Sequence, residues 1–187
     1  MESTSTPYDP DDPRQALAAA DRASHRLSAG LRLPPGFHPA LAVAIALQIG
    51  TAAWGIAAQT GTGLAVALAG AVVFLGFAAL ALHRFRQVNG ARLDGLTSQV
   101  VLGAGTMASS IYVCTFGAAT WAAFESQWWL VAAAAATGGA GYALAARQWW
   151  RAYQLDPVGH AVGASSRALA VLAAVAGLGL VVLLVTG

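Results

Sequence analysis

The chain has 187 residues, of which 57% are hydrophobic and only 10% are charged, and its formal net charge is +2. A soluble domain usually carries about 25% charged residues, so this chain has too few charges to cover a globular surface, and lipid must solvate much of it. All ten basic residues are Arg, and they are scattered along the chain, which argues against a nucleic-acid-binding surface. The lone Cys114 excludes an intramolecular disulfide and a cysteine-based metal site.

Residues 1–38 form the predicted cytoplasmic N-terminal segment. Residues 1–11 are rich in Ser, Thr, Pro and Asp, which is typical of disorder. Residues 12–30 predict an amphipathic helix, with Asp12 as its N-cap and Pro13 at its first position. Residues 31–38 contain two prolines and predict a hinge into the membrane. This helix either lies on the membrane surface or docks onto a protein, and the sequence leaves that choice open.

Residues 39–187 carry five apolar segments, each long enough to cross a hydrocarbon core of about 30 Å. The expected spans are residues 40–58, 64–82, 100–124, 128–146 and 168–187. The third and fourth are the weaker ones, because Ala, Gly and Ser contribute little insertion energy. The fold class that follows is an all-α polytopic membrane protein, a bundle of five transmembrane helices.

The placement of arginine favours five spans over four. With the N-terminus inside, five spans put all ten arginines on the cytoplasmic side and leave Glu125 as the one charged residue in the external turns. A four-span arrangement that skips residues 100–124 would place Arg147, Arg151 and Arg167 outside. The sequence therefore predicts a bacterial inner-membrane protein with a cytoplasmic N-terminus and an external C-terminus.

Aromatic residues border the fourth span at both ends. Trp128 and Trp129 lie at its external end, and Trp149, Trp150 and Tyr153 lie at its internal end. Amphipathic rings are typical of the headgroup level, so these residues are expected to anchor the helix there.

Few polar residues lie within the spans. The candidates for a solute path are Gln48, Thr51, Ser110 and Thr120. Each is flanked by small residues, so the same positions also fit helix packing, in which small side chains let backbones approach and polar ones bond across helices. No Asp, Glu, Lys, Arg or His lies deep in any expected span, and this disfavours ion-coupled transport.

The residues that could carry chemistry lie in the loops. A metal or haem site built from His38, His83 and His160 is conceivable, with Asp94 or Asp156 in support, but no pair has metal-ligand spacing. No nucleophile motif, phosphate loop or dinucleotide fingerprint is present. We therefore expect no catalytic residues, no cofactor and no metal.

Two polar, arginine-bearing stretches, residues 83–95 and 147–167, are expected to form the cytoplasmic loops, and we call them the polar islands. Their basic residues, placed to attract anionic lipid headgroups, are Arg84, Arg86, Arg92, Arg147 and Arg151. The two islands share a few residues in order, and a duplicated hairpin is an open alternative.

The run LALHRFRQVNGARLDGLTSQVVLGAG at residues 80–105, with the preceding LRLPPGF, resembles small multi-pass membrane proteins of high-GC actinobacteria. That resemblance implies a membrane location and a bacterial source, and it implies no activity.

Two function classes remain. The first is a non-catalytic accessory, regulatory or scaffolding subunit, whose partners are membrane lipids and other membrane helices, in a homo-oligomer or a partner protein. The second is a small transporter or channel subunit that acts as an oligomer. A membrane enzyme using His83, Asp94 or His160 is a weaker third.

Overall fold

The computed structural model describes residues 13–89, 105–156 and 174, and over these residues helices joined by short turns are the only regular secondary structure. Its helices are α1 (Pro13–Gly30), α2 (Phe37–Ala58), α3 (Gly61–Asn89), α5 (Gly105–Phe124) and α6 (Trp128–Leu155). By length and composition, α2, α3, α5 and α6 are each able to cross a membrane. The prediction of an all-α protein with several helices able to cross a membrane is therefore confirmed for the described residues. The expected fifth span, residues 168–187, lies outside the described residues except for residue 174.

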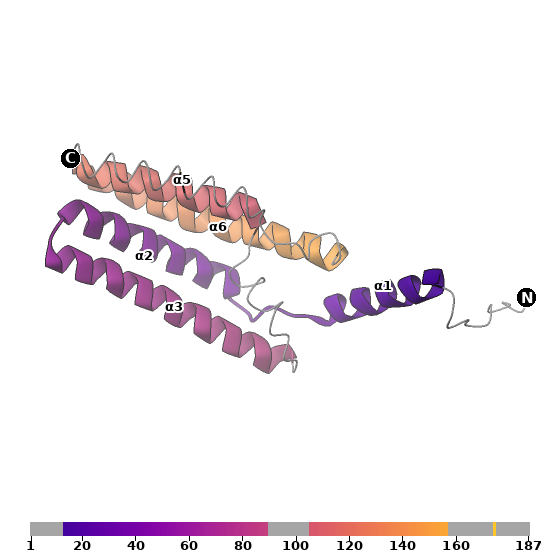
Figure 1. The fold of residues 1–187 in the computed structure, drawn as a ribbon. Coiled ribbons are helices and arrows are strands. Elements are labelled where there is room, and N and C mark those ends of the chain that lie inside the picture. Colours follow the sequence, from indigo (N-terminus) through magenta and orange to yellow (C-terminus); the bar gives the residue numbers. More distant parts are fainter. Residues whose placement is uncertain (1–12, 90–104, 157–173, 175–187) are drawn as a thin grey trace, which may run out of the picture.

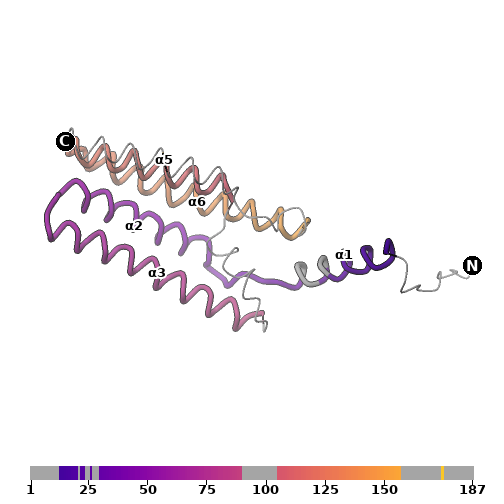
Figure 2. Tube along the Cα trace, in the orientation of Figure 1, coloured from indigo at the N-terminus to yellow at the C-terminus, as the bar shows by residue number. Residues whose placement is uncertain are grey.

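The four long helices form two antiparallel hairpins. Helices α2 and α3 make one hairpin, and α5 and α6 make the other, as the colour gradient along the chain shows (Figures 1 and 2). Helix α2 packs against α3 on one side and against α6 and α5 on the other, and α5 packs extensively on α6. Helix α2 is therefore the centre of the bundle, and α3 is its edge.

The helix boundaries follow from local chemistry. Gly36, at φ 76°, precedes α2 in the left-handed conformation that glycine adopts without strain. Helix α3 continues beyond the expected span to Asn89, because residues 83–89 contain no glycine or proline to stop it. Helix α6 likewise continues to Leu155, just before the Asp156-Pro157 pair. The expected spans mark where the chain leaves the apolar region, whereas the helices run on into the polar islands.

Glycines bring the helix backbones into contact. A Cβ atom placed on Gly63 of α3 would lie 2.6 Å from the carbonyl oxygen of Gly55 on α2, which no real side chain tolerates. On α6, a Cβ atom on Gly138 would lie 2.7 Å from Ile49 Cδ1, and one on Gly139 would lie 3.0 Å from Ala46 Cβ. Lipid tails supply little hydrophobic drive between membrane helices, so close van der Waals approach of this kind holds the bundle together.

The core runs along the inner side of α2. Leu41, Ile45, Ile49 and Ala53 are at most 3% exposed and pack against buried alanines of α5 and α6. They recur every four residues, which places them on one face of the helix. The face that α2 turns to the second hairpin is therefore its most buried one.

A second, smaller cluster closes the end of the bundle where α2 begins and where α3 and α6 end. It consists of Leu31, Phe85, Trp150 and Tyr153, and we call it the hinge cluster. The Trp150 ring meets Phe85 edge-on, with ring centroids 6.4 Å apart. Helix α1 extends beyond this end of the bundle (Figure 1). Its residues Ala16, Leu17, Ala20 and Ala23 are exposed, so what this face contacts stays a prediction.

Candidate functional site

The polar side chains inside the bundle differ in whether they find a hydrogen-bond partner on their own helix. The hydroxyls of Thr51, Ser110 and Thr120 each donate to the carbonyl four residues earlier, at 2.8 Å in all three cases. Such bonds need no other helix and leave no donor free. Three of the four candidate path residues are thus satisfied locally.

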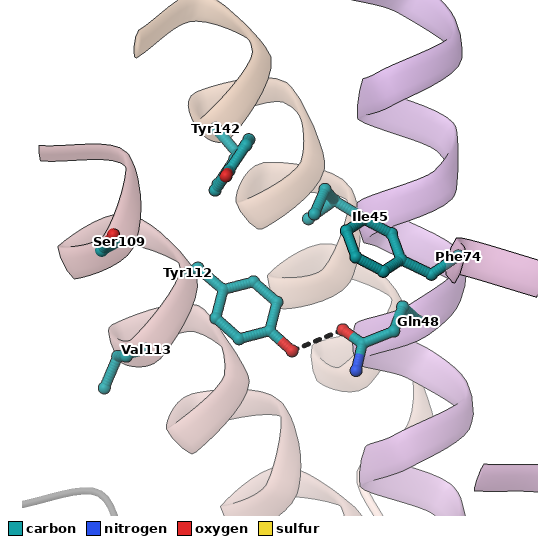
Figure 3. Close-up of a pocket in the computed structure, with 7 residues that line it drawn as sticks. All are labelled: Ile45, Gln48, Phe74, Ser109, Tyr112, Val113 and Tyr142. Carbon is teal, nitrogen blue, oxygen red and sulfur yellow. Dashed lines mark hydrogen bonds between the residues drawn. The ribbon is translucent and has the colours of Figure 1, made fainter. Parts of the chain in front are cut away.

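Gln48, the fourth candidate, bonds to a different helix. The hydroxyl of Tyr112 on α5 donates a hydrogen bond to Gln48 Oε1 on α2 (Figure 3). This bond joins the two hairpins through a region where an unpaired amide is costly, because lipid offers no hydrogen-bonding partner. Gln48 and Tyr112 therefore form the polar centre of the bundle.

A cavity of about 270 Å³ lies beside this pair. Helix α2 contributes Ile45 and Gln48 to its lining, and α3 contributes Phe74. Figure 3 shows the side chains arranged around it. The remaining lining residues are Ser109, Tyr112 and Val113 of α5 and Tyr142 of α6. All four long helices thus meet at one mostly apolar cavity that has polar atoms at a few points.

The four candidate path residues do not line a common passage. Only Gln48 lines the cavity. Thr51 lies against Gly70 of α3, where an added Cβ would collide with its side chain, and Thr120 is 1% exposed. Ser110 is the neighbour of the lining residue Ser109, but its own hydroxyl bonds to Thr106 on the same helix. Within the described part of the chain, Thr51 and Thr120 therefore pack between helices, and Gln48 lines the cavity.

Sequence reasoning gave no role to Tyr112 or Tyr142. A tyrosine in a weakly apolar span resembles any other aromatic core residue, and 64 positions separate Tyr112 from Gln48. One signal was available. The glutamine amide does not bond back to the carbonyl four residues earlier as a Thr or Ser hydroxyl does, and it has both a donor and an acceptor to satisfy. Gln48 therefore required a partner on another helix, and the hydroxyl of Tyr112 lies within an expected span.

The basic residues gather at one end of the bundle. Arg84 and Arg86 lie in the last two turns of α3, and Arg147 and Arg151 lie in the last part of α6. These two helices end beside each other in the hinge cluster. Glu125 lies in the turn between α5 and α6, at the opposite end. Arg92 lies outside the described residues, so its position stays a prediction.

Asn89, the one asparagine of the chain, ties the hinge to α3 at this end. Its Oδ1 accepts a hydrogen bond from the backbone N–H of Arg32 at 2.8 Å, and its Nδ2 donates to the carbonyl of Arg32 at 2.9 Å. Gln154 of α6 donates to the carbonyl of Leu31 at 3.5 Å. The side-chain amides of Asn89 and Gln154 thus hydrogen-bond to the backbone of residues 31–32 and connect the hinge to α3 and α6.

Two aromatic residues at the C-terminal end of α6, Trp150 and Tyr153, have a different environment from the expected one. Trp150 and Tyr153 are 8% and 4% exposed, because they pack on Leu31 and Phe85 within the protein. At the other end, Trp128 and Trp129 are 50% and 71% exposed. Trp128 and Trp129 are thus exposed at one end of α6, whereas Trp150 and Tyr153 pack against the hinge at the other.

The loop chemistry considered from the sequence falls partly outside the described ranges. His83 pairs with Gln87 on the same helix at 3.0 Å, and the Nε2 atom of His38 is buried without a hydrogen-bond partner. Asp94 and His160 lie outside the described residues. Among the described residues, no three His, Cys, Asp or Glu side chains come together as a metal site would require.

In comparisons with known proteins, no family model, no curated protein and no solved structure matches this chain, so its function has to be argued from its own residues.

Proposed function

We propose that the chain is a non-catalytic accessory, regulatory or scaffolding subunit of a bacterial cytoplasmic membrane, and that its helix α3 docks against another membrane helix. The observation that carries the proposal is the outward face of α3. In the most apolar 18-residue stretch of α3 only 17% of residues are buried, against 44% in that of α6. Most residues in this stretch of α3 are thus not buried within the protein, as far as its described residues show.

This outward face has the composition of a helix-packing surface. Large apolar side chains border it, and Leu64, Leu68, Val72 and Leu75 are each 58–67% exposed. Small residues lie between them, and the exposed ones are Ala65, Ala69, Gly76 and Ala79. A Cβ atom on Gly76 would meet nothing within 4 Å.

The interior of the same bundle uses the same chemistry. Gly55 and Gly63 let α2 and α3 touch through their backbones, and Gly139 does so for α2 and α6. Small residues at this spacing let a second helix approach closely, which is the main source of affinity between helices in lipid. The outward face of α3 would therefore accept a helix in the way that α2 already accepts one.

The test is association in the membrane. The tagged protein is isolated in mild detergent, and the proteins that accompany it are identified and quantified by mass spectrometry. Gly76→Ile puts a branched side chain into the proposed interface and should release a stoichiometric partner, or convert a homo-oligomer into monomers. Gly117→Ile is the matched control, since Gly117 is an exposed helical glycine of α5 that also has nothing within 4 Å.

Two results would contradict the proposal. One is wild-type protein that is monomeric and free of any stoichiometric partner. The other is an association that Gly117→Ile abolishes and Gly76→Ile leaves intact, since the interface would then lie on α5.

We propose five spans with the N-terminus in the cytoplasm and the C-terminus outside. The support is that the described arginines of α3 and α6 lie at one end of the bundle, as the positive-inside rule requires of a cytoplasmic face. A Cys114→Ser background with one new cysteine, at Gln127 or at Arg86, tests the orientation. A membrane-impermeant maleimide applied to intact cells should label Gln127→Cys and spare Arg86→Cys, and the reverse pattern would refute it.

A further inference from the structure

We propose that the cavity between α2, α3, α5 and α6 binds the ring of a membrane-dissolved molecule that is flat, mostly apolar and bears a carbonyl oxygen, as a quinone does. The volume of about 270 Å³ is just below the usual range of small-molecule pockets, which begins at about 300 Å³. It has room for one ring system.

The walls suit an aromatic ring. Phe74, Tyr112 and Tyr142 contribute aromatic side chains from three different helices, and Ile45 adds an aliphatic surface. Figure 3 shows the Tyr112 ring in the middle of the drawn region, with Phe74 on one side of it and Val113 on the other. Aromatic walls of this kind favour a flat ligand through offset-stacked or edge-on contacts.

One donor at the cavity lacks a partner. Tyr112 donates to Gln48 Oε1, which fixes the amide group and leaves Gln48 Nε2 without a hydrogen-bond partner among the described residues. The hydroxyl of Ser109 is already bonded to the carbonyl of Gly105 at 3.3 Å. An amide N–H in lipid is costly to leave unpaired. A ligand carbonyl would accept its hydrogen bond, and a pure hydrocarbon would not.

The position of the cavity selects a ligand that partitions into lipid. Gln48 lies near the middle of α2, which spans residues Phe37–Ala58. The lining residues Phe74 and Val113 are half-buried on α3 and α5, two helices that share no extensive interface among the described residues. A molecule dissolved in the bilayer would reach the cavity between these two helices.

The binding experiment uses the full chain in lipid nanodiscs, in a Cys114→Ser background because quinones add to thiols. The probes are menadione and 2-methylnaphthalene, which share a fused ring system, and only menadione has carbonyl groups. Menadione should bind saturably, one per chain, above the signal of empty nanodiscs. It should bind roughly tenfold more tightly than 2-methylnaphthalene, the increment expected of one hydrogen bond.

Two variants locate the site. Gln48→Leu is combined with Tyr112→Phe, because the loss of Gln48 alone would free the Tyr112 hydroxyl to donate to the ligand carbonyl. This double variant should lower the affinity for menadione to that for 2-methylnaphthalene. Ser109→Phe fills the cavity and should abolish binding of both probes. Ser110→Phe is the matched control, because it adds the same ring to a neighbouring residue that does not line the cavity.

Three outcomes would overturn the proposal. The first is no saturable binding of menadione above empty nanodiscs. The second is equal affinity for the two probes in the wild-type protein, which would mean a cavity that holds any hydrocarbon, an acyl chain included. The third is equal loss in Ser109→Phe and Ser110→Phe. If Ser109→Phe fails to fold, the Gln48→Leu/Tyr112→Phe double variant decides, through the difference between the affinities for the two probes.

Discussion

Gly139→Ala should destabilise the bundle although alanine is the better helix former. The added Cβ atom would lie 3.0 Å from Ala46 Cβ and closer still to the backbone carbonyl of Ala42, both on α2. A carbonyl in the middle of a helix cannot move without shifting the helix. Overpacking costs about 1–3 kcal/mol, and a backbone obstacle places this case near the upper end.

The gain in helix propensity offsets part of that cost. Replacing Gly by Ala inside a helix stabilises it by about 0.5–1 kcal/mol. The net loss expected for Gly139→Ala is therefore about 2 kcal/mol in the free energy of unfolding. The assay is reversible unfolding in mixed micelles with increasing dodecyl sulfate, followed by far-ultraviolet circular dichroism.

Gly117→Ala is the control, because an added Cβ atom there meets nothing within 4 Å. This variant should be as stable as the wild type or up to about 1 kcal/mol more stable. If Gly139→Ala were as stable as Gly117→Ala, the close contact of α6 with α2 would not be a determinant of stability, and the packing argument would fail.

Three further predictions concern the hinge and the core. Asn89→Leu should speed hydrogen exchange at the Arg32 amide and expose the hinge to protease while α3 stays folded; unchanged exchange would show that the amide bonds do not hold it. Leu31→Ala removes a buried side chain from the hinge cluster and should cost about 2–3 kcal/mol of unfolding free energy in the same micelle assay. Thr120→Val should change stability by less than about 1 kcal/mol, because the Thr120 hydroxyl bonds only to the Phe116 carbonyl of its own helix; a larger loss would mean that the hydroxyl serves another partner.

The sequence predicts well that the described chain is helical and that four of its helices are long and apolar enough to cross a membrane, because composition and segment length decide both. Helices α2 and α5 end close to the expected limits of their spans. Helix α3 ends later than its expected span, because the mostly polar residues 83–89 end the apolar run but remain helical. A hydropathy pattern predicts which residues lie in lipid and which in water. The positions where helices end depend instead on the glycines and prolines.

The centre of the bundle is less accessible to sequence reasoning. Gln48 stands out as the polar residue of its span, but the sequence offers several hydroxyls as its partner. Only the packing of α5 across α2 selects Tyr112. The same holds at the hinge, where Trp150 and Tyr153 have the composition of headgroup anchors and instead meet Leu31, about 120 positions earlier in the chain. Contacts between distant segments depend on helix rotation, which hydropathy does not fix.

The tight α2–α3 hairpin bears on how the protein enters the bilayer. Only Gln59 and Thr60 separate the two helices, and neither is charged. The contact between Gly55 and Gly63 adjoins this turn, so both helices can pair before either is fully inserted. Moving this turn across the bilayer takes no charged side chain through the hydrocarbon. Moving the arginine-bearing ends of α3 and α6 across it would. The α2–α3 hairpin is thus suited to enter a membrane as one preformed unit, led by its uncharged turn.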